Sequence, residues 1–405
     1  MEKRNVLILG AGGVAHVAAH KFAQNNDLFN NIYLASRSLE SCQQIIESIE
    51  RKHSYKYPGK KIEIEKIDAF CIPEMIKLMK ELKISITVNL ASAFCNMSIL
   101  EACIKTGSAY IDTAIHEDPN KVCENPPWYA NYEWKRKDEC QNKGITAILG
   151  SGFDPGVVNA YAAYAKKHFF DKIDTIDIMD VNAGNHGKYF ATNFDPEINF
   201  REFVKVWSWI DKKWVCKPVY SEKRIYDFPV VGRQTLYLTG HDEIHSLSKN
   251  IDVNSIRFWM SFSDHYINCF TVLKNIGLLS EKPVKTAEGV EVVPLKVVKA
   301  CLPDPKTLAA DYTGNTCIGN LISGSKGTDK KEIFIYNVCS HEACYKEIEA
   351  QAISYTAGIP AVTAAILVSR GVWDIKKMVN VEELNPDPFL DLLKDLGLPT
   401  NIITK

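Results

Sequence analysis

A strand, a glycine turn and a helix at the start of the chain constrain its fold more than any other feature. The apolar run 6–9 (Val-Leu-Ile-Leu) leads directly into the sequence Gly-Ala-Gly-Gly-Val-Ala at 10–15. In a parallel α/β sheet the first glycine permits a tight turn and the second lets the backbone approach a pyrophosphate, which binds the free N–H groups of the helix. We therefore predict a dinucleotide-binding turn made of Gly10, Gly12, Gly13, Val14 and Ala15, the last replacing a third glycine.

The end of the next strand predicts which dinucleotide binds. It carries Ser36, Arg37 and Ser38, at the spacing of ~20 residues that the motif expects. Enzymes that use NAD usually place an acidic residue here to hold the ribose 2′-hydroxyl. A cation flanked by hydroxyls suits a 2′-phosphate instead, so we predict NADPH as the cofactor. The alternatives are an ordinary tight turn for the glycines and a solvated surface charge for Arg37.

Apolar strands alternate with amphipathic helices through residues 5–165, which predicts a Rossmann-type, doubly wound parallel sheet. The expected strands are 5–9, 31–35, 61–66, 85–89, 109–111 and 146–149. We assign residues 1–155 to a dinucleotide-binding domain to which 345–405 return. The small apolar helix around 359–367 is expected to pack on this domain and to end near Gly371.

Polar residues follow several of these strands, and the carboxyl ends of parallel strands share one edge of the sheet. That edge is where such sheets bind their ligands. Each residue alone could be a simple cap or turn residue. As a set they predict a cofactor rim of Asp68, Asn89, Leu90, Ala91, Asp112 and Thr113.

The pattern changes near residue 170, and residues 156–344 predict a second, α+β domain built on an open, mostly antiparallel sheet. We expect this domain to bind substrate and to form a dimer contact, because an open sheet face needs covering. Residues 116–127 predict a long loop over the site. The expected strands are 173–181, 200–206, 214–218, 255–262, 316–323 and 333–338, with a turn at 325–330 and helices at 242–249 and 295–301.

Composition excludes several classes of function. The chain has 405 residues and a formal net charge of −1, so we expect neither a nucleic-acid partner nor a membrane partner. The strand that begins almost at once leaves no room for a signal peptide, and the apolar stretch 360–368 is too short to span a bilayer. Twelve scattered cysteines predict free thiols in the cytoplasm. Cys339, His341 and Cys344 lack a fourth ligand at a zinc-like spacing, so no metal site is predicted.

Several longer motifs carry a resemblance to the saccharopine dehydrogenase-like (saccharopine reductase) family, and it covers nearly the whole chain. The glycine motif is shared with many dehydrogenases, and Ala15-His16 departs from a glycine-containing pattern that the fingerprint tolerates; the motifs in the middle of the chain are more specific. The motifs lie at 8–14, 34–37, 152–157, 182–188, 191–199 with 201–202, 336–339 and 354–356.

The resemblance implies an NADPH-dependent reductive condensation of L-aspartate β-semialdehyde with a diamine in polyamine biosynthesis. Putrescine would give carboxyspermidine, and 1,3-diaminopropane would give carboxynorspermidine. One rival is a saccharopine-forming reductase, whose second substrate carries two carboxylates and needs a further cation. The other is a sensor that binds NADPH without turnover.

Imine formation needs groups that move protons and groups that hold both substrates. Asp154, at the join between the first sheet and the second domain, is the first catalytic candidate, although an Asp-Pro pair also suits a helix cap. His186 is the second, with an exposed loop histidine as its alternative.

Arg201 is the expected ligand of the substrate carboxylate, because a guanidinium binds carboxylates bidentately; its alternative is an ion pair with Glu197 or Glu202. Asn182, Asn193 and Asn199 are candidates for the amino-acid head. For the diamine's far ammonium the sequence leaves four acids open: Asp180, Asp195, Glu117 and Asp118.

Overall fold

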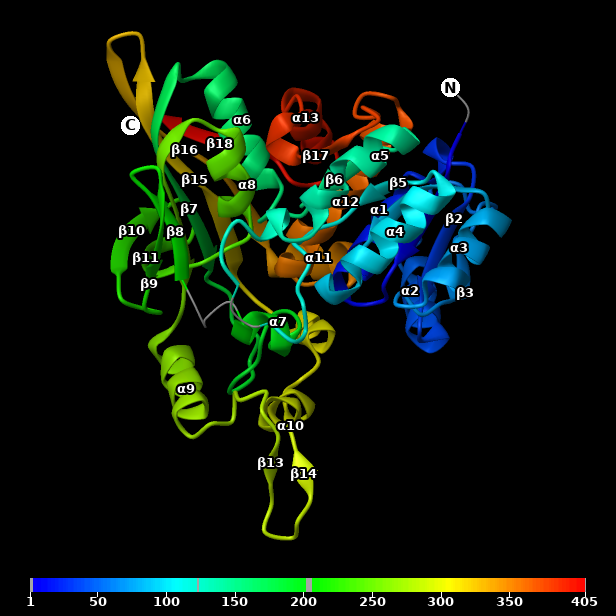
Figure 1. The fold of residues 1–405 in the computed structure, drawn as a ribbon, viewed down its shortest axis with the longest axis horizontal. Helices are drawn as coiled ribbons and strands as arrows, with labels where there is room; N and C mark the ends of the chain where they lie inside the picture. The colour runs from blue at the N-terminus through cyan, green and yellow to red at the C-terminus, as the bar shows by residue number, and fades with distance from the viewer. Residues whose placement is uncertain (1–2, 122–123, 202–205, 405) are drawn as a thin grey trace.

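The computed structural model describes residues 3–121, 124–201 and 206–404. Two sheets, each flanked by helices, lie side by side, and the chain ends beside the second one (Figure 1). One apolar core runs through both, because α6 (Val157–His168) and α12 (Ala352–Ser369) contribute buried side chains to the same cluster as the two sheets.

The first sheet is parallel, in the order β17-β6-β5-β4-β1-β2-β3. It confirms the predicted doubly wound sheet and its strands to within a residue or two. The C-terminal part of the chain adds β17 at one edge. The strands are β1 (Asn5–Leu9), β2 (Ile32–Ser36), β3 (Glu63–Lys66), β4 (Ile84–Asn89), β5 (Ala109–Ile111), β6 (Ala147–Leu149) and β17 (Met378–Asn380).

Helices cover both faces of this sheet (Figure 1). The helix α12 packs along α1 and contacts β4 and β5, as expected for the small apolar helix, whereas residues 401–404 of the same C-terminal segment pair with the second sheet. Gly358 makes this possible, because a Cβ there would lie 2.8 Å from the Val14 carbonyl oxygen. The other helices are α1 (Gly13–Gln24), α2 (Leu39–Arg51), α3 (Ile72–Glu81), α4 (Asn96–Thr106), α5 (Lys137–Lys143), α11 (His341–Ile348) and α13 (Asp387–Asp395).

The apolar stretch 360–368 proves to be part of this longer helix. Within the described ranges α12 is the one helix whose length and apolar composition would let it cross a membrane, and 83% of it is buried inside the protein. A core helix of a folded domain passes the same test. The contacts of α12 with α1 and with the parallel sheet fit that role.

The second sheet is mostly antiparallel, as predicted; β12 and β7 pair in parallel. Its main path runs β10-β11-β12-β7-β15-β16-β18, so the C-terminal strand closes one edge. The strands are β7 (Lys172–Asn182), β8 (Val206–Ile210), β9 (Lys213–Lys217), β10 (Lys223–Phe228), β11 (Gly232–Thr239), β12 (Val253–Ser261), β15 (Asn315–Lys326), β16 (Asp329–Ser340) and β18 (Asn401–Thr404).

The predicted strand 200–206 is wrong at its start. Phe200 and Arg201 belong to the short helix α7 (Pro196–Arg201), and the next strand, β8, begins at Val206. Residues 202–205, including Glu202, lie outside the described ranges. The strands β10, β11 and β18 were not predicted.

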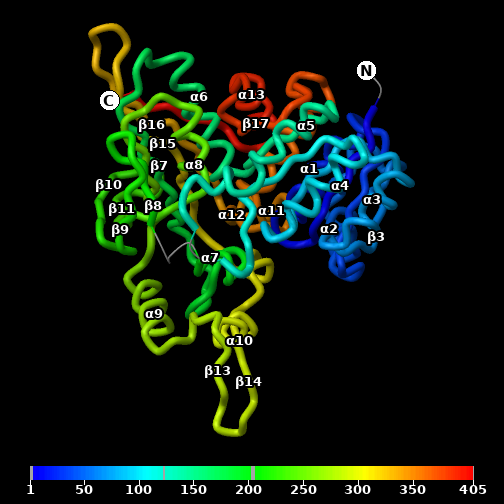
Figure 2. Tube along the Cα trace, in the orientation of Figure 1, coloured from blue at the N-terminus to red at the C-terminus, as the bar shows by residue number. Residues whose placement is uncertain are grey.

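An arm projects from the second domain away from both sheets (Figures 1 and 2). It consists of α9 (Asp264–Asn275), the hairpin β13 (Val284–Lys285) and β14 (Glu291–Val292), and α10 (Pro294–Cys301). The helix α10 contacts α7 at the base of the arm. On the opposite side, α8 (Glu243–Asn250) lies between the second sheet and α6.

Candidate active site

A cleft of about 710 Å³ opens between the two sheets, at the carboxyl edge of the parallel one. It is lined by the glycine turn, by the segments that follow β4 and β5, and by the ends of β7 and β11. Predicted residues that line it are Gly12, Gly13, Val14, Leu90, Ala91, Thr113, Glu117, Asp118, Asp154, Asp180, Asn193, Asp195 and Arg201. The fold thus brings thirteen predicted residues from both halves of the sequence into one space.

The glycine turn fits a dinucleotide pyrophosphate. Gly10 has φ +113°, and a Cβ there would lie 2.4 Å from the Leu90 carbonyl oxygen, so the turn packs against the end of β4. A Cβ on Gly12 would meet nothing within 4 Å, so its backbone faces open space. The first turn of α1 has no acidic residue and no side-chain cap, which leaves its N–H groups for an anion. Ala15 lies in the core beneath the turn.

The segment after β2 lies outside the cleft, at the same edge of the sheet. The Ser38 hydroxyl caps α2 by accepting a hydrogen bond from the Ser41 N–H. Arg37 is exposed, which fits both a cation that binds the 2′-phosphate and the alternative of a solvated surface charge, so its contact with the cofactor stays a prediction. Ser36 is half-buried and accepts from the Ser38 N–H, while Asp68 is exposed and accepts from the Phe70 N–H.

Two predicted rim residues, Asn89 and Asp112, are buried and hydrogen-bond to neighbouring segments of the rim. The Asn89 side chain is buried, donates to Asn96 and accepts from the Ala91 N–H. Asp112 is buried and accepts from the Gly150 N–H, so it joins the ends of β5 and β6. Burial raises the pKa of Asp112 to about 7. Neither side chain lines the cleft, so their predicted contact with the cofactor stays a prediction.

The cleft is strongly acidic. Among the described residues that line it, eight are aspartate or glutamate and four are lysine or arginine. Each of the four cations already has a carboxylate partner: Lys121 with Asp118, Arg201 with Glu117, Lys299 with Asp195 and Lys306 with Asp304. The surplus of negative charge predicts a cationic ligand.

Asp180 and Asp242 carry that surplus deep in the cleft. Asp180 lies near the end of β7, and its Oδ1 accepts no hydrogen bond from any described residue. Asp242 immediately precedes α8, and its Oδ2 accepts from the Ile115 N–H at 2.8 Å. Burial raises the pKa of both carboxyl groups to about 6. Ionising a buried carboxyl group costs free energy, and a bound ammonium would offset that cost and keep both Asp180 and Asp242 ionised.

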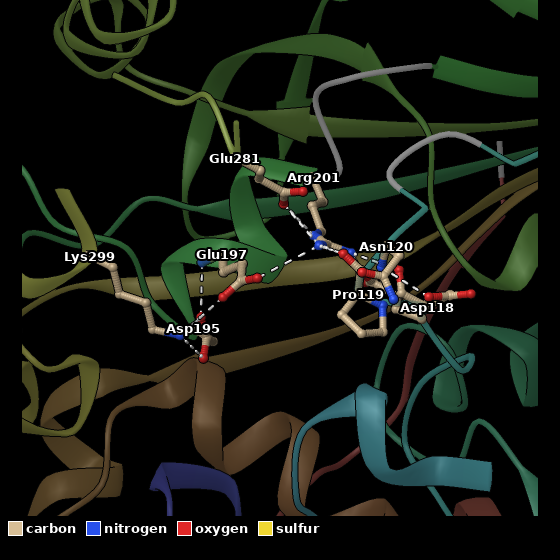
Figure 3. A network of polar contacts seen from close by, with 9 residues as sticks. Asp118, Pro119, Asn120, Asp195, Glu197, Arg201, Glu281 and Lys299 are labelled. Atoms are coloured by element: carbon tan, nitrogen blue, oxygen red, sulfur yellow. Dashed lines mark hydrogen bonds and ion pairs between the residues drawn. The ribbon is translucent and has the colours of Figure 1, made fainter. Parts of the chain in front are cut away.

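The guanidinium of Arg201 is already paired with carboxylates and connects neighbouring segments of the chain (Figure 3). Its side chain is 7% exposed and contacts the carboxylates of Glu117, Glu197 and Glu281 at 3.4, 3.6 and 2.9 Å. It also donates to the backbone carbonyls of Asp118 and Pro119. These partners join α7, the 116–121 loop and the base of the arm. The predicted carboxylate-binding role would require the guanidinium to exchange at least one of them.

The predicted residues from the 182–193 segment form a separate network. Asn182 donates to the Tyr312 hydroxyl, which in turn donates to Asn193, both at 2.7 Å. His341 stacks on Tyr312 and hydrogen-bonds to Asn182. Of this group only Asn193 lines the cleft. His186 packs edge-on against Tyr312 outside the cleft, so its predicted catalytic role is not supported by a contact with that space.

Asp154 lies at the join that the sequence predicts, between β6 and α6, and it lines the cleft. The capping alternative is wrong, because α6 begins at Val157 and Gly156 is its N-cap. The Gly156 N–H donates to the Asn159 side chain at 2.9 Å. Asp154 therefore stays a candidate for contact with the substrate or with the reacting end of the cofactor.

Sequence reasoning did not name eight described cleft residues that carry charge or exchange protons: His116, Lys121, Glu124, His241, Asp242, Lys299, Asp304 and Lys306. His241 and Asp242 follow β11, a strand that was not predicted. The signal that could have found them is the run Gly-His-Asp-Glu at 240–243, where three titratable residues follow a glycine at a helix start.

The comparisons with known proteins match this geometry. Residues 6–148 match the family described as the saccharopine dehydrogenase NADP binding domain, and residues 152–398 match the saccharopine dehydrogenase C-terminal domain. A carboxynorspermidine synthase of Vibrio alginolyticus is 45% identical over 398 residues, 98% of this chain and 96% of that protein. A carboxyaminopropylagmatine dehydrogenase of Synechocystis sp. is 40% identical over 403 residues, 97% of this chain and 96% of that protein.

A carboxynorspermidine synthase of Vibrio cholerae is 44% identical over 401 residues, 98% of this chain and 97% of that protein. Among solved structures, the apo saccharopine dehydrogenase (L-Glu forming) of Saccharomyces cerevisiae superposes with a TM-score of 0.71. It has 13% sequence identity and covers 99% of this chain and 100% of that one, so it supports the fold. The chain is a member of the saccharopine dehydrogenase family of oxidoreductases.

Proposed function

We propose that this protein catalyses the NADPH-dependent reductive condensation of L-aspartate β-semialdehyde with a diamine. The observation that carries the proposal is the pair of carboxylates, Asp180 and Asp242, in the same cleft as the glycine turn. None of the described lysine and arginine residues that line the cleft forms an ion pair with either of them. The names of the relatives support the same reaction, because each name includes a carboxylated amine of the kind that this condensation would produce.

NADPH, when bound, supplies a hydride that reduces the imine carbon to a secondary amine. The residues that would hold it are Gly12, Gly13 and Val14 at the pyrophosphate and Arg37 at the 2′-phosphate. The protein's own contribution is to bind the two substrates together, which turns an encounter in solution into an effectively intramolecular step. Asp180, Asp242 and Glu117 supply the negative charge that draws the diamine in.

The length of the amine stays open between putrescine and 1,3-diaminopropane. One methylene is worth ~1–3 kcal/mol in a pocket, and the side chains that line the cleft do not mark its end wall. The Synechocystis relative adds agmatine-type amines, whose far end is a guanidinium. All three amines have a cationic far end, so the acidic cleft suits each of them.

A saccharopine-forming reaction is less well supported by the same charges. Glutamate as the amine would bring two carboxylates into a cleft where each of the four described lysine and arginine side chains already has a carboxylate partner. A non-catalytic NADPH sensor would not need a second, acidic substrate space beside the glycine turn. Both alternatives predict no diamine-dependent turnover.

The deciding experiment follows NADPH oxidation with aspartate semialdehyde and one of four amines: putrescine, 1,3-diaminopropane, agmatine or glutamate. We expect turnover that requires a diamine or agmatine. Turnover with glutamate and a longer semialdehyde alone would establish saccharopine chemistry, and NADPH binding without any turnover would establish the sensor.

Variants then test the acidic pair. Asp180→Asn and Asp242→Asn should each raise the diamine KM roughly 10- to 100-fold, because a hydrogen bond to a charged group contributes about 1.5–3 kcal/mol. The Kd for NADPH should stay unchanged. The matched control is Asp174→Asn, on the same strand β7, where the carboxylate pairs with Lys172 at the surface.

We also propose that the enzyme works as a homodimer in the cytoplasm. Support comes from the open sheet of the second domain and from the free cysteines among the described residues. Light scattering of the purified protein tests the dimer, and fractionation of the producing cells tests the location.

A further inference from the structure

We infer that a histidine–glutamate pair, His241–Glu243, transfers the protons of this reaction, with His241 as the catalytic residue and Glu243 as its positioning residue. The inference deepens the proposed function and rests on it. It names the acid–base group that imine formation requires, which neither the family match nor the names of the relatives identify.

The geometry of the pair is that of an oriented proton-transfer group. His241 Nδ1 lies 2.6 Å from Glu243 Oε2. Glu243 is fully buried, with 0% of its surface exposed, while His241 lines the cleft. The imidazole also stacks on Phe258, with ring centroids 4.1 Å apart and an interplanar angle of 11°. A carboxylate on one nitrogen and a flat apolar support fix both the tautomer and the orientation of the ring.

The local fold explains why these two residues meet. The strand β11 ends at Thr239, Gly240 turns the chain, and α8 begins at Glu243. Glu243 therefore occupies the first turn of a helix, where a negative charge is favoured by the helix dipole. The chain between them is short enough for the His241 ring to reach back to that carboxylate.

His241 stands beside the acids that would bind the amine. The ionisable groups around it are Glu243, Asp242 and His245 on its own segment and Asp180 on β7. Through Glu243 the ring is held at Nδ1, so proton exchange with a substrate would occur at Nε2. An amine that enters as an ammonium ion would thus meet both its counter-ions and a proton acceptor.

The other histidines near the cleft are less suited to transfer protons to a substrate there. His116 also lines the cleft, but its Nδ1 hydrogen-bonds to the Ala93 carbonyl at 3.1 Å, a neutral partner. His186 does not line the cleft, and its Nδ1 accepts from the Lys188 N–H. Of the histidines that line the cleft in the described part of the chain, His241 is the one hydrogen-bonded to a carboxylate.

The proton moves twice. First, His241 Nε2 takes a proton from the substrate ammonium, and the resulting amine attacks the aldehyde carbon, forming the C–N bond while the carbonyl π electrons move to oxygen. Transfer of the amine's second proton to that oxygen gives a neutral carbinolamine. The imidazolium then returns its proton to the hydroxyl as the C–O bond breaks. Water leaves, a protonated imine remains, and His241 is neutral again.

The test begins with His241→Asn, which keeps a polar side chain but cannot shuttle protons. We expect kcat to fall roughly 10²- to 10⁴-fold, as is typical of lost acid–base catalysis, with the Kd for NADPH and the diamine KM changed by less than about threefold. The acid limb of kcat/KM that His241 contributes should disappear, while a limb from Asp180, Asp242 and Glu117 should remain.

The matched control is His168→Asn. His168 also pairs with a carboxylate, Asp387, at 2.8 Å, but the pair lies on the surface and outside the cleft. This variant should keep wild-type kcat and the wild-type pH profile. The comparison separates loss of a histidine–carboxylate pair as such from loss of the one in the cleft.

Glu243→Gln tests the positioning role with a readout independent of turnover. In the free protein, ¹⁵N NMR of the His241 ring should show the Nδ1–H tautomer in wild type and a mixture in the glutamine variant. Glu243→Asp should restore part of the tautomer preference and part of kcat.

The outcomes separate the two proposals. Wild-type protein without diamine-dependent turnover would refute the proposed function, whatever the variants do. Wild-type turnover with kcat and pH profile retained in His241→Asn, or lost instead in His116→Asn, would refute the inference alone. So would a diamine KM that rises in His241→Asn while kcat stays constant, because that pattern belongs to a binding residue.

Discussion

At the scale of single residues, Gly10 and Gly12 lie two positions apart in one turn but serve different purposes. Gly10 is required by the fold, since its φ is +113° and a Cβ there would lie 2.4 Å from the Leu90 carbonyl oxygen, which leaves no room for a side chain. Gly12 has an ordinary φ of −89° and open space around it. Its lack of a side chain matters only when a ligand approaches.

Gly10→Ala and Gly12→Ala should therefore fail in different ways. We expect Gly10→Ala to cost at least about 2 kcal/mol of unfolding free energy, through strain and displacement of Leu90. Gly12→Ala should leave the Tm within about 1 °C of wild type but weaken NADPH binding tenfold or more, about 1.4 kcal/mol. Thermal unfolding and fluorescence titration with NADPH measure the two effects. A normal Kd in Gly12→Ala would place the pyrophosphate elsewhere.

Arg37 decides between the two dinucleotides. Arg37→Asp should raise the KM for NADPH far more than the KM for NADH, because an aspartate repels the 2′-phosphate and can accept from a 2′-hydroxyl. A shift of the KM ratio by roughly 100-fold is expected, the sum of one lost and one reversed charge interaction. Arg233→Asp, an exposed arginine on β11, is the control for a change of net charge. Equal effects on both cofactors would refute the 2′-phosphate assignment.

The candidate site was predictable where chemistry follows a strand in the sequence. Leu90, Ala91, Thr113 and Asp180 all lie at strand ends and all line the cleft. His241 and Asp242 were not predictable in this way, because they enter the cleft only through the pairing of β11 with β12. Such non-local pairing leaves no trace in local periodicity.

At the scale of elements, Arg201 connects three parts of the chain that lie 80 or more residues from it or from one another in the sequence. It joins α7, the 116–121 loop through Glu117 and two carbonyls, and the arm through Glu281 (Figure 3). Phe94 lies beneath the guanidinium, with its centroid 5.0 Å away. A partly buried cation with three carboxylates is costly to remove, because those carboxylates then repel one another.

Arg201→Ala should lower the unfolding free energy by about 3 kcal/mol and speed proteolytic cleavage within residues 116–121. Limited proteolysis with mass spectrometry measures the cleavage. Lys217→Ala serves as the control, since it removes a two-membered ion pair with Glu222 in the second domain. If the guanidinium instead holds the substrate carboxylate, the variant will raise the semialdehyde KM with its Tm and cleavage rate unchanged.

The elements themselves show where sequence patterns succeed. Buried parallel strands such as β1 and β4 are short apolar runs bounded by turns, and their bounds were predicted almost to the residue. The run 200–206 is less apolar, with charged residues among its phenylalanines and valines; Pro196 starts a helix there, and α7 packs Phe200 against Phe270 of the arm. Strand β10, Lys-Arg-Ile-Tyr-Asp-Phe, lies at a sheet edge and lacks the regular alternation of polar and apolar residues that predicts a strand, so its sequence resembles an exposed loop.

At the scale of the whole molecule, buried titratable groups set the pH at which the fold is most stable. Burial raises the pKa of Asp112 and Glu117 to about 7 and of Glu133 to about 8. For such groups the stabilising protonated form is fully present below the ordinary carboxyl pKa, near 4, and is lost as the pH rises through 7 and 8. Burial lowers the pKa of His20 and His245 to about 2 and 3. These two histidines therefore reduce the stability of the fold only below about pH 6.5, where they take up protons in the unfolded chain but not in the folded one.

Below about pH 6.5 these two effects oppose each other, whereas above pH 6.5 only the carboxyl effect remains, so the unliganded protein should lose stability there until the pH passes the folded pKa values of 7 to 8. Above pH 6.5, we expect the unfolding free energy to fall toward pH 8.5, by up to about 1.4 kcal/mol per pH unit for each carboxyl that is still protonated in the folded state and ionised in the unfolded chain. Glu133→Gln should flatten this fall, because Glu133 is fully buried, its Oε2 accepts no hydrogen bond from a described residue, and glutamine can still accept from the His116 N–H.

Thermal unfolding at the two pH values, for wild type, Glu133→Gln and the exposed control Glu40→Gln, measures the effect. Glu40→Gln should follow wild type. A saturating diamine should raise the Tm more at pH 8.5 than at pH 5.5, because only the ionised forms of Asp180, Asp242 and Glu117 attract it. A wild-type Tm that climbs from pH 6.5 to 8.5 would mean that these acids are ionised in the fold at little cost. That outcome would contradict the raised pKa values, whereas a diamine that raises the Tm no more at pH 8.5 than at pH 5.5 would contradict the case for a cationic substrate held by these carboxylates.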